Sequence, residues 1–149
     1  GLWFMLGVCG HAAGALACNR LVRAIPMKKL VLISAFITAL GASLMLVLVW
    51  SGLNHPLAVM GPMMLYLFGH GITSPLCMMG AVAPFPRLAG TASALFGFVL
   101  ALVAALVGQV AMRFYDGTGI SLACIVVISA ACLLVTAGIV AGRQPLAAG

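Results

Sequence analysis

The sequence predicts an all-α polytopic membrane protein with five transmembrane helices in one domain, residues 1–149. Hydrophobic residues make up 65% of the chain and charged residues 5%, whereas a soluble domain carries roughly a quarter charged residues to cover its surface. The mean hydropathy is +1.31. The apolar residues also fall into five runs of about the length that crosses a bilayer, separated by turn-forming residues.

These runs define the expected helices in chain order. A bilayer core about 30 Å thick takes roughly 20 helical residues, because no backbone polar group can be left unpaired in lipid. The first run, which is short, ends before NRLVRAIPMKK, the second before SGLNHP, the third before PFPRL and the fourth before YDGTG. Pro, Gly, Asn and Asp in these connections end helices. The expected spans are residues 2–18, 30–50, 57–83, 89–114 and 120–141.

The charges predict an orientation. Seven Lys and Arg residues against one acid, Asp116, give a formal net charge of +6. The basic residues lie at the ends of the apolar runs without interleaved aromatic residues, which disfavours nucleic-acid binding. Short cytoplasmic loops carry the excess of Lys and Arg, and here the first connection, Arg87 and Arg143 share one side. We therefore expect the N-terminus outside and the C-terminus in the cytoplasm.

Several other classes are disfavoured. The five cysteines lie inside apolar runs without metal-ligand spacing, so they are interpreted as small hydrophobic residues. Clustered methionines could bind Cu(I), but no Cys or His reinforces them, so a metal transporter is a weaker alternative and no metal ligand or cofactor is expected. The one acidic residue lies at a span boundary, and no set of nucleophile, base and orienting group can be identified, which disfavours an enzyme. Because the chain starts inside an apolar run, at GLWFMLG, we interpret it as a piece of a longer protein.

Two stretches carry a family resemblance. The connection GALACNRLVRAIPMKK, residues 14–29, fits ordinary positive-inside anchoring, and its spacing also resembles a loop of the major facilitator superfamily. The residues of that loop motif are Asn19, Arg20, Lys28 and Lys29. The stretch GHGITSPLCMMGAVAPFPRLAGTASALFGF, residues 69–98, resembles the tenth-to-eleventh helix segment of the Bcr/CflA multidrug resistance transporters.

The resemblance implies that the chain corresponds to helices eight to twelve of a twelve-helix transporter, a partial C-terminal half. Such a protein lies in the bacterial inner membrane and exchanges drugs or other small amphipathic molecules for protons. Its implied partners are the lipid bilayer, the N-terminal half of the same transporter, the substrate and protons. The alternative from another class is a non-transporting membrane scaffold or subunit.

Small residues in two spans predict close helix packing. Gly10 and Gly14 are four residues apart in the first span, and Gly90 and Gly97 lie in the fourth. Small residues let membrane helices approach closely, which is how such helices associate in lipid. Generic helix packing explains these glycines. The resemblance also implies that the two helices lie at the interface between the two transporter halves.

The third span carries a polar stripe. Its members fall on one helical face at positions i, i+4, i+7, i+8 and i+11, and the resemblance implies that this helix lines the central cavity. A histidine in a span is costly without a partner and is a candidate functional group. His70 is therefore a hydrogen-bonded packing residue, a substrate contact or a proton carrier, since histidine titrates near neutral pH. The stripe consists of Tyr66, His70, Thr73, Ser74 and Cys77.

The same span contains helix-breaking residues. Pro75 removes the hydrogen bond to the carbonyl of Gly71, so a kink or hinge is expected near these positions and Gly69. Interrupted helices mark binding sites in many transporters, although packing alone also explains these residues.

Overall fold

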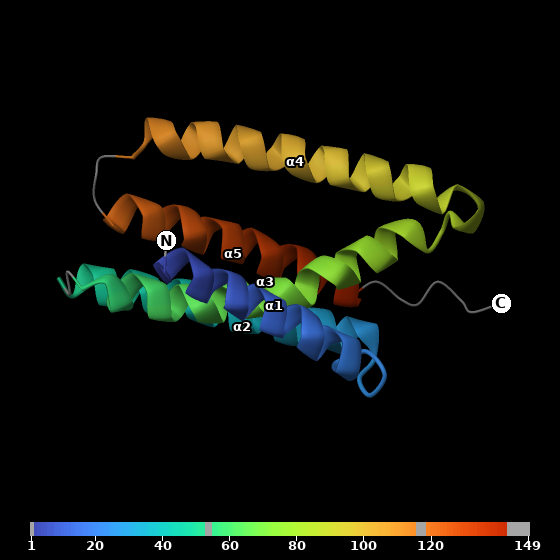
Figure 1. Cartoon of the computed structure of the whole chain (residues 1–149), viewed down its shortest axis with the longest axis horizontal. Coiled ribbons are helices and arrows are strands. Elements are labelled where there is room, and N and C mark those ends of the chain that lie inside the picture. The colour runs from blue at the N-terminus through green and yellow to red at the C-terminus, as the bar shows by residue number, and fades with distance from the viewer. Residues whose placement is uncertain (1, 53–54, 116–118, 143–149) are drawn as a thin grey trace.

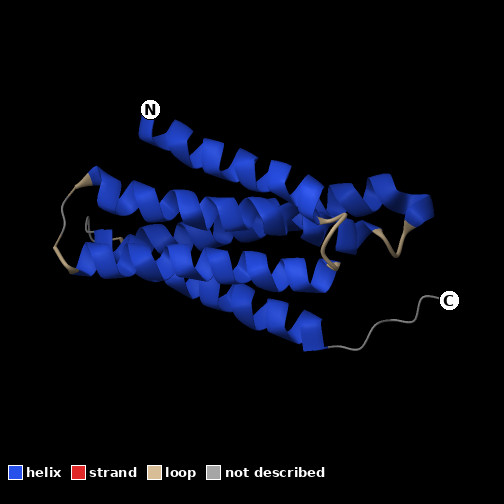
Figure 2. Cartoon of the chain, turned by 90° about the horizontal axis from the view of Figure 1, so that it is seen from below, coloured by secondary structure: helices blue, strands red, loops and turns tan. Residues whose placement is uncertain are grey.

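The computed structural model describes residues 2–52, 55–115 and 119–142. The described part is helical throughout and contains no strand, as expected for the all-α class (Figures 1 and 2). The elements are α1 (Leu2–Leu21), α2 (Met27–Trp50), α3 (Pro56–Val82), the short 3-10 helix η1 (Pro86–Leu88), α4 (Ala89–Arg113) and α5 (Gly119–Gly142).

Four helical segments are long and apolar enough to cross a membrane: α2, α3, η1 together with α4, and α5. The chain is therefore an all-helical, multi-pass membrane protein. The span expected at residues 2–18 lies within α1, which continues to Leu21, and its crossing of the membrane stays a prediction.

Local residues explain where the helices begin and end. Pro26 precedes α2, and Pro56 opens α3 while the His55 side chain accepts a hydrogen bond from the Leu57 backbone N–H at 3.2 Å. Proline suits a first helical position because the N–H it lacks has no helical partner there. After α2, Gly52 has φ of 77°, a left-handed conformation that glycine adopts at helix ends without strain.

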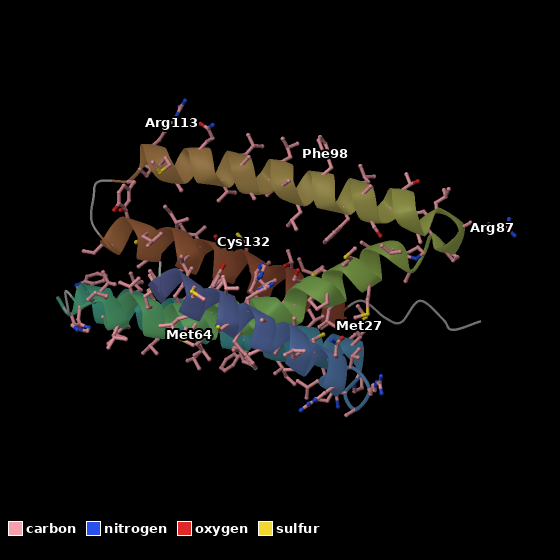
Figure 3. The ribbon with its side chains drawn as sticks, viewed as in Figure 1. Met27, Met64, Arg87, Phe98, Arg113 and Cys132 are labelled. Atoms are coloured by element: carbon pink, nitrogen blue, oxygen red, sulfur yellow. The ribbon has the colours of Figure 1, made fainter. Side chains whose placement is uncertain are left out.

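Consecutive helices run in opposite directions (Figure 1). The C-terminal ends of α1 and α3 lie at one end of the bundle, and those of α2 and α4 lie at the other. Arg87 and Arg113 mark these two ends (Figure 3). The structure thus places the basic first connection and Arg87 at the same end of the bundle, while Asp116 and Arg143 lie outside the described residues.

The third helix is the centre of the bundle. Both α1 and α2 pack against α3, and α5 packs against α2. One apolar cluster joins α1, α2 and α3 through Cys18, Leu30, Ile72 and Leu76. A second joins α2 to α5 through Ala42, Val126 and Ala130.

The fourth helix stands apart from this bundle. None of its residues is buried, and Figure 1 shows it separated from α5 along its length. A Cβ built on Gly90 or Gly97 meets no atom within 4 Å. In the described part of the chain, these two predicted packing glycines therefore have no helix against them.

Candidate functional site

The stretch Gly69-His70-Gly71 faces two different helices. A Cβ on Gly69 would collide with α2, 2.7 Å from the Thr38 backbone nitrogen and 2.8 Å from the Ser34 carbonyl oxygen. A Cβ on Gly71 would instead collide with the His11 carbonyl oxygen of α1. Each glycine admits the backbone of one neighbouring helix, and His70 lies between the two contacts.

The contact between α1 and α3 continues from one turn of α1 to the next. A Cβ on Gly10 would lie 2.9 Å from the Met64 carbonyl oxygen, and one on Gly14 would overlap the Phe68 carbonyl oxygen. The backbones of α1 and α3 therefore touch at Gly10, Gly14 and Gly71. This contact fixes the separation of the two helices at their middle.

The close contact brings two histidines together. The ring centroids of His11 and His70 are 5.5 Å apart with the rings tilted by 37°. The Tyr66 ring stacks on His70 at 6.5 Å between centroids. His70 is exposed on the bundle surface, while His11 and Tyr66 are half-buried. We define these three residues as the histidine cluster.

Sequence reasoning placed Tyr66 and His70 on one face but did not pair His70 with His11. A pattern was available, because each histidine adjoins a glycine of the helix contact: Gly10-His11 on one helix and His70-Gly71 on the other. Only the crossing of the helices shows that the two pairs meet.

Thr73 of the predicted stripe faces α2 in a buried polar network. Its hydroxyl donates to the Ser34 hydroxyl at 2.9 Å and also approaches the Gly69 carbonyl oxygen at 3.1 Å. The Ser34 hydroxyl donates to the Val31 carbonyl oxygen at 2.9 Å. The network joins the middle of α3 to α2.

Replacing Thr73 with valine is expected to weaken the packing of α3 against α2. Hydrogen bonds between membrane helices contribute about 0.6 kcal/mol on average, so T73V should lower the free energy of unfolding by about that amount. Denaturant unfolding of T73V, Ser34→Ala and the double variant should give a coupling energy of similar size.

The matched control is Thr136→Val. The Thr136 hydroxyl bonds only to carbonyl oxygens of its own helix, those of Cys132 and Leu133. T136V should show no coupling to Ser34→Ala, and additivity of T73V with Ser34→Ala would contradict the inferred role of the network.

An apolar cavity of about 370 Å³ lies between α2, α3 and α5. Its volume is within the range of sites for small molecules, roughly 300–1,000 Å³. The only hydroxyl groups among the lining residues belong to Thr73 and Thr136, and each already donates to a protein oxygen. The lining residues are Met27, Val31, Thr73, Leu76, Cys77, Gly80, Leu133, Thr136, Ala137 and Val140.

The structure thus divides the predicted stripe. Thr73 and Cys77 line the cavity, whereas Tyr66 and His70 belong to the histidine cluster. Ser74 is half-buried. The lining residues of α2 and α5 were missed in the sequence, since an apolar run does not show which of its residues face a gap.

The expected hinge residues lie in a continuous helix. The helix α3 runs unbroken through Pro62 and Pro75, and its C-terminal part rises away from α1 and α2 in Figure 1. Gly69 and Gly71 are buried and Pro75 is half-buried. In this structure Gly69 is in contact with α2 and Gly71 with α1.

The loop-motif residues gather at one end of the bundle. Asn19 and Arg20 are exposed at the end of α1, and Lys28 and Lys29 lie in the first turn of α2. Within the described residues, no group of three or more His, Cys, Asp or Glu side chains could hold a metal ion. Comparison of the chain with protein-family models, curated proteins and solved structures gave no match.

Proposed function

We propose that the chain is part of a secondary active transporter of the major facilitator superfamily, one that exports drugs or other small amphipathic molecules in exchange for protons. The resemblance of residues 69–98 to the Bcr/CflA transporters suggests this class. The observation that carries the proposal is the cavity between α2, α3 and α5.

The chemistry of the cavity suits an amphipathic substrate. Its walls are mostly aliphatic side chains, together with the Cys77 thiol, two threonines and the thioether of Met27, which adapts to ligands of different shape. Both hydroxyl protons are used inside the protein, so a hydrogen bond between a ligand and Thr73 or Thr136 would be one that the threonine oxygen accepts. A largely apolar molecule with a hydrogen-bond donor fits such a site.

The proposed location is the bacterial inner membrane. The basic end of the bundle, which contains Arg20, Arg23, Lys29 and Arg87, would face the cytoplasm. The N-terminus of the chain would then lie outside and the C-terminus inside. In this proposal the remaining helices, including the N-terminal half, complete the transporter.

Labelling of Cys77 tests the proposal. In a variant that retains Cys77 as its single cysteine, a drug that occupies the cavity should slow modification by N-ethylmaleimide several-fold, because Cys77 lines the cavity wall. The control retains Cys132 instead, which is exposed on α5 and is not among the lining residues (Figure 3). Equal labelling of Cys77 with and without every drug tried would favour a non-transporting scaffold.

A further inference from the structure

The connection between α1 and α2 concentrates positive charge at one end of the bundle. Residues 20–29 contain four basic residues and no acidic one. Of these, Lys28 is half-buried, and the other three are exposed. Figure 3 shows nitrogen-tipped side chains gathered around this connection. We define the three exposed residues, Arg20, Arg23 and Lys29, as the basic cluster.

The backbone of this connection is folded tightly. The backbone N–H groups of Ala24 and Ile25 both donate to the Leu21 carbonyl oxygen, at 3.0 and 2.8 Å. The side chains of Leu21 and Ile25 also pack against the apolar cluster that joins α1, α2 and α3. The core of the bundle therefore keeps the backbone of the basic cluster in place. The described residues contain no Asp or Glu, so no side-chain carboxylate there neutralises the cluster.

An exposed apolar stripe of α2 begins one turn after the basic cluster. Ile33, Phe36 and Leu40 follow Lys29 at positions i+4, i+7 and i+11, which places all four residues on one helical face. The three apolar side chains are exposed. Because α2 is long and apolar enough to cross a membrane, this face runs along the hydrocarbon, and Lys29 in the first turn lies at the depth of the headgroups.

We propose that the basic cluster and the apolar stripe together bind an anionic phospholipid of the leaflet at this end of the bundle. The phosphate of the headgroup lies against Arg20, Arg23 and Lys29. The acyl chains run along Ile33 and Phe36 toward the middle of the membrane. The site does not depend on the proposed transport function.

The combination of charges and apolar side chains selects this class of ligand. Basic residues beside a membrane helix attract anionic headgroups, about fivefold in affinity for each Lys or Arg. Arginine also binds phosphate through two parallel hydrogen bonds. A free phosphate ion could use the basic cluster but not the stripe, and an uncharged lipid could use the stripe but not the cluster. An anionic phospholipid uses both.

Arg87 lies at the same end of the bundle but outside this site. It follows the C-terminal part of α3, which rises away from α1 and α2 (Figure 1). Figure 3 shows Arg87 well apart from Met27 in the first turn of α2. Arg87 is exposed, so its replacement removes one positive charge from the same leaflet without touching the site.

Tryptophan quenching by brominated lipid tests the proposal. In the purified full chain with Trp3→Phe and Trp50→Phe, Phe36→Trp places a single tryptophan on the stripe, about 10 Å along α2 from Lys29. The protein is reconstituted in phosphatidylcholine bilayers with increasing fractions of phosphatidylglycerol that is brominated in its acyl chains. Quenching should show phosphatidylglycerol enriched at least about fivefold beside the introduced tryptophan.

The native Trp50 provides the matched control on the same helix. It is exposed at the other end of α2, where the last turn carries no basic residue. A protein that keeps Trp50 as its single tryptophan, with Trp3→Phe, should show no enrichment of phosphatidylglycerol.

Charge variants locate the headgroup. Arg20→Gln, Arg23→Gln and Lys29→Gln should each reduce the enrichment at residue 36, and the triple variant should abolish it. Arg87→Gln should leave the enrichment unchanged. Excess inorganic phosphate should also leave it unchanged, since free phosphate has no acyl chains to occupy the stripe.

Absence of enrichment at residue 36 with the basic cluster intact would overturn the site, even where a charge variant fails to fold. Equal enrichment at Trp50, or an equal loss in Arg87→Gln and Lys29→Gln, would contradict a site at the basic cluster, and displacement by inorganic phosphate would contradict a lipid ligand. The measurement needs no drug or proton gradient. Unimpeded labelling of Cys77 would therefore leave the lipid site standing, and absent enrichment would leave the transport proposal standing.

Discussion

Replacing Gly71 with leucine is expected to abolish the folded bundle. Even a single Cβ at this position overlaps the His11 carbonyl oxygen, which belongs to the backbone and cannot rotate away. The larger side chain would force α1 off α3. The expected result is loss of monodisperse protein on gel filtration in mild detergent.

Replacing Gly71 with alanine should destabilise the bundle in the same way as leucine but to a smaller extent. Overpacking by small groups costs about 1–3 kcal/mol, so G71A should lower the free energy of unfolding by about that amount, and Gly14→Ala should behave similarly because its Cβ would overlap the Phe68 carbonyl oxygen. The matched control is Gly97→Ala in α4, where a Cβ meets nothing within 4 Å. Equal stability of G71A and Gly97→Ala would contradict the described contact of α1 with α3.

Phenylalanine at Gly80 is expected to remove ligand binding while the bundle stays folded. Gly80 lines the cavity, and a Cβ there meets only the flexible end of Met27, at 3.5 Å. The aromatic ring can therefore occupy the cavity without displacing backbone. If the cavity is the substrate site, affinity for a transported drug should fall at least about tenfold, a loss of about 1.4 kcal/mol.

Equilibrium binding of a fluorescent drug to the purified protein measures this loss. Gly90→Phe provides the control, since Gly90 faces no neighbouring atom within 4 Å. Unfolding of G80F and wild-type protein under the same conditions separates blocked binding from lost structure. Unchanged affinity in a folded G80F variant would place the substrate elsewhere.

The helix boundaries could be predicted closely because they depend on local chemistry. Apolar runs of bilayer length must form helices to satisfy their backbone groups, and the breaks are marked by residues such as Pro56 and Gly52. The expected span 57–83 corresponds to Pro56–Val82, and the expected span 120–141 corresponds to Gly119–Gly142. These features need no knowledge of neighbouring helices.

The candidate site could be predicted only in part, since a helical face does not identify its neighbours. Tyr66, His70, Thr73 and Cys77 share a stripe in projection, but α3 is surrounded by other helices and adjacent positions on it meet different ones. Thr73 therefore reaches Ser34 of α2, whereas His70 reaches His11 of α1. Which residues of two helices meet depends on how the helices cross, and the spacing of residues within one helix does not reveal that crossing.

The central position of α3 has a consequence for biosynthesis. The helices α1 and α2 leave the ribosome before α3, yet each packs chiefly against α3 rather than against the other. Until Pro56–Val82 has entered the bilayer, the glycines of α1 and α2 lack the helix that they contact in the folded structure. The packing of this bundle therefore begins only with the arrival of the third of these helices.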